Sequence, residues 1–366
     1  MANNQKNTPP NPNSNTADKR IKAEKTERNS SIELFRIIAT LSVLIVHFNG
    51  WFVGGLPSKL DFKYFDWHWG QFLIGAASCV CVNLFLIISG YFGVKFKISS
   101  FVHIGLLLLG IFIPLHIIGF LLNHSFDLRL LLSQIWIITR SGYFIQCYLM
   151  LLFLSPLLNS FVKGNSRRSV LIWTLLLWSI EIWFGCIKEA KSLAFMNGYG
   201  FIHFALIYMM ARCVRLHQDE LLKLSKWIWI GGYIACTGLL WLMLGSGIHW
   251  EYANPINVIS SFCLFMPFLY YNYYNKTVNW IAKSTLAVYV IQVTYPVFGY
   301  LCDLDTNMLG SLPYALYLLA SLGVIAIVFM ACILYDKILW KFFSPIEKFI
   351  SSKMGEKHYY STLFNS

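Results

Sequence analysis

Long apolar segments recur along the chain, separated by short polar connections. Ten of them approach the roughly 20 residues that an α-helix needs to cross a bilayer, at 31–52, 71–94, 99–122, 143–162, 169–187, 199–216, 226–245, 254–274, 283–302 and 313–336. This pattern predicts an all-α fold, a polytopic integral membrane helical bundle of about ten transmembrane helices. The apolar stretch 130–138 is too short to cross, and it predicts an interfacial or re-entrant piece.

Composition supports a membrane protein and fixes the predicted domain limits. The chain is 57% hydrophobic and 13% charged, whereas soluble domains average about 25% charged residues. Residues 1–30, rich in Asn, Pro, Lys and Glu, predict a disordered polar cytoplasmic tail. Residues 31–340 then form one membrane domain, and 341–366 a cytoplasmic C-terminal tail. The nine cysteines lack paired spacing, which predicts neither a disulfide framework nor a metal site.

The basic residues are distributed unequally between the two predicted sides of the membrane. With the N-terminus in the cytoplasm, 22 of the 29 Lys and Arg residues fall on the inner side and six on the outer side. Arg36 lies inside the first span. The positive-inside rule therefore places both termini in the cytoplasm. Because topology accounts for the net charge of +12, we expect no nucleic-acid partner, and membrane lipid as a secondary contact.

The first span carries ionisable groups that hydrocarbon disfavours: Glu33, Arg36 and His47. Arg36 and His47 are eleven residues apart, which is three helical turns plus about 20°. They share one stripe, about 16 Å apart along the axis, and we interpret them as the skeleton of a buried catalytic site. The alternatives are an Arg36 that extends to the interface and a His47 that is a hydrogen-bonded core residue. Ser30 and Glu33 match a capping box, and Glu33 also pairs with Arg36 in spacing.

Other polar residues within the spans predict a polar cavity, although each alone is more often a helix-packing hydrogen bond. The second span contributes two buried polar residues, Asn83 and Ser89, and is followed at its inner end by Lys95 and Lys97. Later spans add tyrosine, glutamine and asparagine side chains. The candidate substrate-binding residues are Asn83, Ser89, Lys95, Lys97, Tyr143, Gln146 and Asn257.

Several segments, in order, resemble the membrane-bound acyltransferase family 3. That family opens with a basic residue, ten others and a histidine, the positions that Arg36 and His47 fill. The stretch NLFLIISGYF at 83–92 is similar to its second helix, and 143–159, 199–216 and 283–297 resemble later segments. The likeness is closest to the branch that modifies bacterial exopolysaccharides and surface glycans.

The resemblance implies an O-acyltransferase of a bacterial cytoplasmic membrane. Its donor would be acetyl-CoA or another short acyl-CoA, a co-substrate rather than a bound cofactor, and its acceptor a hydroxyl of a glycan or glycolipid. Arg36, Lys95 and Lys97 suit the phosphates or the thioester region of the donor. His47 suits a general base or a transient acyl carrier, and the sequence leaves both open.

Two positions depart from the family pattern. Gln292 stands where the family often has histidine, so we assign it no proton-transfer role. Lys95 and Lys97 stand where many members carry several arginines.

A second hypothesis is a transporter or flippase for a lipid-linked sugar or small solute. Transporters also carry intramembrane charge and Pro-interrupted helices, such as those at Pro114 and Pro296. They usually show paired internal repeats as well, and none stands out in this sequence. Coenzyme A binding separates the two hypotheses.

Overall fold

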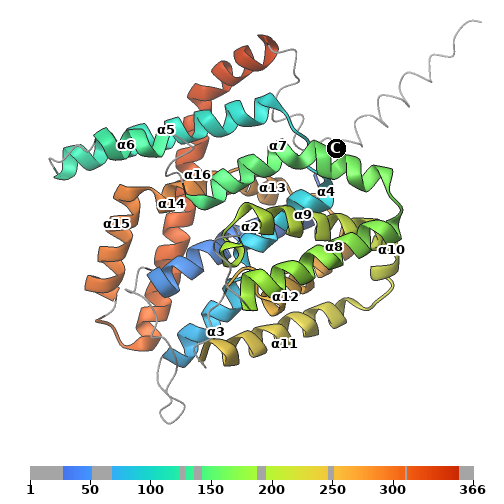
Figure 1. Ribbon diagram of the computed structural model, residues 1–366. Helices are drawn as coiled ribbons and strands as arrows, with labels where there is room; N and C mark the ends of the chain where they lie inside the picture. Colours follow the sequence, from blue (N-terminus) through green and yellow to red (C-terminus); the bar gives the residue numbers. More distant parts are fainter. Residues whose placement is uncertain are drawn as a thin grey trace, which may run out of the picture.

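The computed structural model describes residues 28–51, 68–123, 128–135, 142–187, 195–245, 251–309 and 311–353. Within these ranges every regular element is a helix (Figure 1). Residues 1–27 of the predicted 1–30 tail lie outside them, and Ser30, the last residue of that tail, already begins the first helix. The fold class is therefore all-α, as the apolar pattern predicts.

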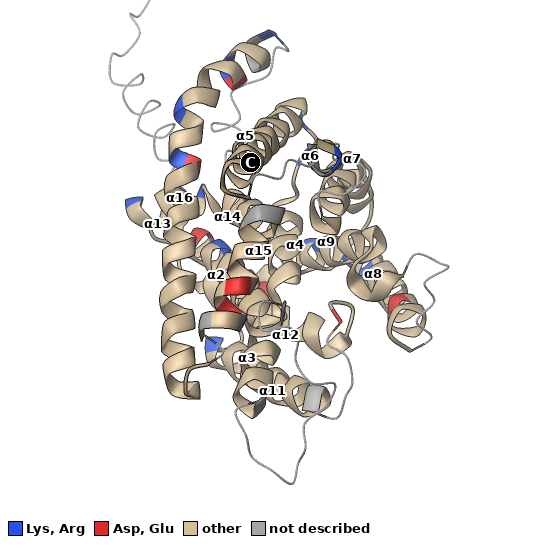
Figure 2. Cartoon of the chain, turned by 90° about the vertical axis from the view of Figure 1, so that its left-hand side faces the viewer, with Lys and Arg blue, Asp and Glu red and all other residues tan. Residues whose placement is uncertain are grey.

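Six helices are long and apolar enough to cross a membrane within the described residues, or up to seven if a bent pair is one span. They are α2 (Ser30–Val46) with its extension to Asn49, α3–α4 (His68–Ser78 and Cys81–Phe92), α5 (Ile98–Asn123), α7 (Tyr143–Gly164), α8 (Arg167–Glu181) with its extension to Ile187, and α16 (Tyr314–Lys353). Charged residues are sparse along these ribbons except in the C-terminal part of α16 (Figure 2). The chain is a helical membrane protein.

The remaining predicted spans coincide with one unbroken 20-residue helix and with shorter or broken ones. They are α9 (Phe201–Leu216), α11 (Lys226–Gly245), α12 (Pro255–Phe265) with a 3-10 turn (Met266–Tyr270), and α13–α15 (Lys276–Ala282, Thr285–Val293 and Tyr295–Asp303). The bent pair, 276–293 and 297–303, turns by 69° at its break. Residues 130–135 of the 130–138 stretch belong to the short helix α6 (Leu128–Ile135), and 136–138 lie outside the described residues. Helix α10 (Gln218–Leu221) is a single turn.

Helix α2 lies in the bundle core and packs against α4, α13 and α14. Its N-cap is Asn29, whose side chain accepts a hydrogen bond from the Ser31 amide at 2.9 Å. The predicted capping box is therefore wrong. The hydroxyl of Ser30 instead donates to Asn279 Oδ1 at 2.8 Å, and this bond ties the start of α2 to α13.

Helices α4 and α9 pack closely because a glycine lies at their contact. A Cβ on Gly90 would lie 2.4 Å from the backbone oxygen of Tyr208, a distance that real Cβ atoms do not reach. Small residues allow this close approach of membrane helices. Helix α4 ends one turn later at Gly93, whose φ of 65° is in the left-handed region that glycine adopts easily.

Candidate active site

A pocket of about 410 Å³ opens between α2, α4, α5, α7 and α13–α14. Five cationic side chains from three stretches of the chain line it: Arg28, Arg36, Lys95, Lys97 and Lys283. We call it the basic pocket. Four of the predicted site residues line this pocket: Arg36, Ser89, Lys95 and Lys97.

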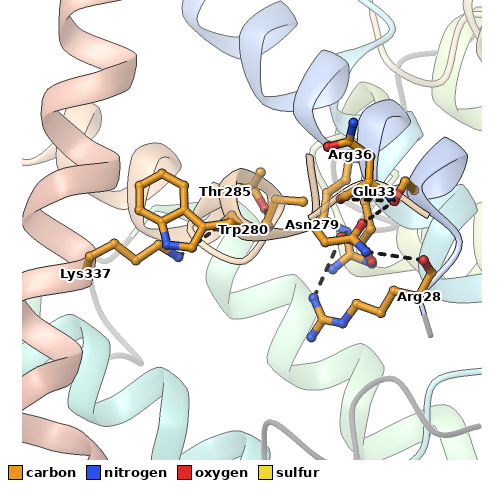
Figure 3. A network of polar contacts seen from close by, with 10 residues as sticks. Arg28, Glu33, Arg36, Asn279, Trp280, Thr285 and Lys337 are labelled. Atoms are coloured by element: carbon orange, nitrogen blue, oxygen red, sulfur yellow. Dashed lines mark hydrogen bonds and ion pairs between the residues drawn. The ribbon is translucent and has the colours of Figure 1, made fainter. Parts of the chain in front are cut away.

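The carboxylate of Glu33 pairs with two of the five cations. Glu33, 4% exposed, lies 4.0 Å from Arg28 Nη1 and 3.9 Å from Arg36 Nε (Figure 3). The predicted pairing of Glu33 with Arg36 is thus confirmed. One carboxylate among five cations leaves a formal excess of four positive charges around the pocket (five minus one). Such a site favours a polyanionic ligand.

The turn after α4 delivers two of these cations. Gly93 reverses the chain, and the Val94 amide donates to the Ser89 carbonyl at 3.0 Å. Lys95 and Lys97 follow directly, Lys95 exposed and Lys97 half-buried. The Ser-Gly-Tyr stretch therefore has a physical role: it packs α4 on α9 and turns the next lysines toward the pocket.

The pocket lining is charged in part and aromatic in part. Four aromatic side chains, of which Phe144 and Tyr289 are buried and the other two half-buried, form what we call the aromatic wall: Phe85, Phe144, Tyr148 and Tyr289. The Phe144 ring centroid lies 5.8 Å from that of Phe85, 6.0 Å from Tyr148 and 5.0 Å from Tyr289. A lining with a charged part and an aromatic part suits a ligand with an anionic head and a thin apolar arm.

His47 is not among the residues that line the basic pocket. It is 7% exposed and begins a π-helical turn, His47–Trp51, at the end of α2. Its Nδ1 lies 3.3 Å from Oε1 of Gln292, which is fully buried on α14. An amide oxygen only accepts, so Nδ1 donates, and a neutral ring then carries its lone pair on Nε2.

The remaining predicted residues lie away from the pocket lining. Asn83 and Asn257 are fully buried. Asn257 Nδ2 donates to the carbonyls of Cys79 at 3.3 Å and Glu251 at 3.2 Å. Tyr143 packs edge-on against Tyr199, with 5.0 Å between centroids, and Gln146 is half-buried on α7. Nothing in this arrangement tests their predicted contact with substrate.

Asn83 belongs to a buried polar chain that sequence reasoning missed. Its Nδ2 donates to the Tyr252 carbonyl at 3.1 Å, which turns its Oδ1 toward His203 Nε2, 2.8 Å away. His203 Nδ1 then lies 2.9 Å from Glu181 Oε1, with both residues 1% exposed. The chain links α4, α8 and α9. Glu181 and His203 occur in segments with few polar residues. An ionisable residue within such a span indicates a buried polar site, so both could have been predicted.

Sequence reasoning also missed three residues that line the basic pocket: Arg28, His103 and Lys283. Arg28 lies within the predicted tail, and Lys283 is not among the candidate residues predicted from the later spans. The His103 ring stacks on Trp340 with 4.2 Å between centroids, and its Nδ1 lies 3.3 Å from Glu347 Oε1 on α16. Arg28 and Lys283 both belong to basic stretches on the predicted inner side, and that basic character could have indicated them.

Comparison with known proteins gives one match. A family model described as an acyltransferase domain, that of acyltransferase family 3, matches residues 29–334. The match begins at the N-cap of α2 and covers every residue of the basic pocket except Arg28. No curated protein and no solved structure matches the chain.

Proposed function

The chain belongs to the acyltransferase 3 family, and from this premise we propose that it moves an acetyl or other short acyl group from cytoplasmic acyl-CoA to a hydroxyl of a cell-surface glycan or glycolipid. Membrane acyltransferase activity follows from the family. The donor, the acceptor and O-acetyl transfer are our proposal.

The observation that carries the donor proposal is the basic pocket. Coenzyme A has three phosphate groups on its nucleotide and a thin arm that ends in the thioester. Five cations at the mouth complement the phosphates through charge-assisted contacts. The arm then extends toward the aromatic wall, where apolar surroundings protect the thioester from water.

His47 is the residue that we assign to the chemistry. With Nδ1 held by Gln292, its Nε2 takes the proton of the acceptor hydroxyl while the hydroxyl oxygen attacks the thioester carbonyl. The carbon–sulfur bond breaks, and the proton passes from His47 to the departing thiolate. A path in which His47 first carries the acyl group on Nε2 balances equally well.

The topology that we propose has about ten crossings and both termini in the cytoplasm. The six apolar helices would be completed by α9, α11, α12 and the bent α13–α15 segment. Four of the pocket cations are among the Lys and Arg residues that fall on the inner side of the predicted topology: Arg28, Lys95, Lys97 and Lys283. In this topology the donor enters from the cytoplasm and the acceptor from outside. We assign the protein to a bacterial cytoplasmic membrane.

The test compares ester content of surface glycans, by mass spectrometry, between cells with and without the protein. We expect esters to disappear without it and to remain absent with His47→Ala. His116→Ala is the matched control, because His116 is another buried histidine, and its Nδ1 bonds within its own helix, at the Phe112 carbonyl. Normal glycan esters in cells carrying a stably inserted His47→Ala protein would refute the catalytic assignment.

A transporter or flippase for a lipid-linked sugar or small solute is the second candidate. The observation in its favour is the 69° break in the bent pair, because broken helices form transporter binding sites. Purified protein in liposomes separates the two. Acyl-CoA consumption coupled to ester formation supports the transferase, and solute uptake without ester formation supports the transporter.

A further inference from the structure

We infer that the aromatic wall sets the length of the acyl group that this protein transfers, with Phe144 and Tyr289 as the specificity-determining residues. The inference rests on the proposed function. It restricts the substrate to acyl-CoA whose acyl group is about the size of acetyl.

The position of the wall follows from two parallel helical segments. Helix α2 and the α13–α14 segment are tied at one end by Ser30 and Asn279 and at the other by His47 and Gln292. Lys283 lines the mouth, Tyr289 follows it by six residues, or about 9 Å of helical rise, and Gln292 follows Tyr289 by one turn. The aromatic wall therefore lies between the cationic mouth and His47.

The two rings close this end of the pocket from opposite sides. Tyr289 comes from α14 and Phe144 from the first turn of α7, with centroids 5.0 Å apart. Both are buried, at 9% and 5% exposure. The Tyr289 hydroxyl reaches α7, where it lies 3.7 Å from a Cβ built on Gly142. The pair thus spans the gap between the two helices.

An acyl group must pass this pair to meet His47. A two-carbon group needs only a small displacement of the rings, whereas each further methylene requires more room in a packed layer. One methylene in an apolar pocket typically changes kcat/KM by about 10- to 200-fold. We therefore expect acetyl-CoA to be preferred over butyryl-CoA by at least about 100-fold.

The experiment measures kcat/KM for acetyl-, propionyl- and butyryl-CoA in purified Phe144→Leu and Phe144→Ala proteins, by thiol release in the presence of acceptor. We expect the acetyl-to-butyryl ratio to fall by about 10-fold or more, further in the alanine variant. Phe153→Leu is the control, because Phe153 lies on the same helix, is exposed and does not line the pocket.

A purely structural role for Phe144 would lower the rates with all three donors in the same proportion. An unchanged ratio, or equal loss with every donor in both variants, overturns the inference. Failure of the proposed function is visible separately, because the wild-type protein would then neither bind coenzyme A in a thermal-shift assay nor release thiol from any donor.

Discussion

Replacing Glu181 tests which atoms donate and which accept hydrogen bonds in the buried Glu181–His203–Asn83 chain. His203 Nε2 must donate to Asn83 Oδ1, because Asn83 Nδ2 is committed to the Tyr252 carbonyl. One further proton then lies between His203 Nδ1 and the Glu181 carboxyl, 2.9 Å apart. The pair is neutral overall and both members are 1% exposed.

Two substitutions at this position should differ sharply. Glu181→Leu leaves Nδ1 without its partner, and breaking a buried pair in this way costs about 3–5 kcal/mol. Interhelical hydrogen bonds in membranes average less, about 0.6 kcal/mol, so we expect about 3 kcal/mol. Glu181→Gln should cost under about 1 kcal/mol, because its amide N–H donates to the lone pair of a neutral His203 Nδ1.

The assay is reversible unfolding in mixed detergent micelles, with Glu220→Leu as control. Glu220 is exposed on α10, and such surface changes stay within about 0.5 kcal/mol. A double variant with His203→Leu should cost less than the sum of the two single changes, since the residues share one interaction. A Glu181→Gln protein as unstable as Glu181→Leu, or a Glu181→Leu protein that unfolds like the control, would refute this hydrogen-bond assignment.

Three further outcomes are expected. Gln292→Leu should lower kcat by about 100-fold without changing coenzyme A binding in a thermal-shift assay, because His47 loses its orienting partner; an unchanged kcat contradicts this. Lys95→Ala combined with Lys97→Ala should raise KM for acyl-CoA about 10-fold or more. KM for acyl-pantetheine, a donor without phosphates, should stay within about twofold of its wild-type value. Equal effects on both donors would argue against phosphate contact. Burial raises the pKa of Asp305, which lies outside the spans, to about 6, so the folded state binds this proton more tightly than the unfolded chain and loses stability as the pH rises from about 4 through 6. Asp305→Asn should therefore have a higher melting temperature than wild type at pH 8, and the difference should close toward pH 4. A difference in melting temperature that does not depend on pH would exclude this account.

The sequence predicts where the helices lie, whereas the number of membrane crossings stays a prediction. All ten apolar segments form helices in the structure, yet six pass as full spans among the described residues. The 254–274 segment gives a short α-helix and a 3-10 turn, since Pro267 lies where a longer helix would need an amide donor. Helix identity follows from local composition, whereas span length depends on breaks that tertiary packing fixes.

The candidate site was predictable where it depends on one helix and unpredictable where it depends on two. Arg36 and His47 follow from spacing within α2. The partner of His47 is Gln292, 245 residues away, and no periodicity links them. Ser30 shows the same limit at the helix start: its type suits a cap, but the bond to Asn279 engages its hydroxyl and leaves capping to Asn29.

The aromatic wall has a consequence for the cell as well as for the substrate. In the proposed topology it separates a cytoplasmic opening from the outer half of the bundle, so it acts as a seal in a membrane that stores energy as an ion gradient. A continuous wet path beside five cations would admit anions and dissipate that gradient. We expect liposomes carrying Phe144→Ala to leak ions faster than those carrying wild type, measured with a potential-sensitive dye; equal leakage would show that other layers hold the barrier. Catalysis across a bilayer then requires that the acyl group cross while the solvent does not.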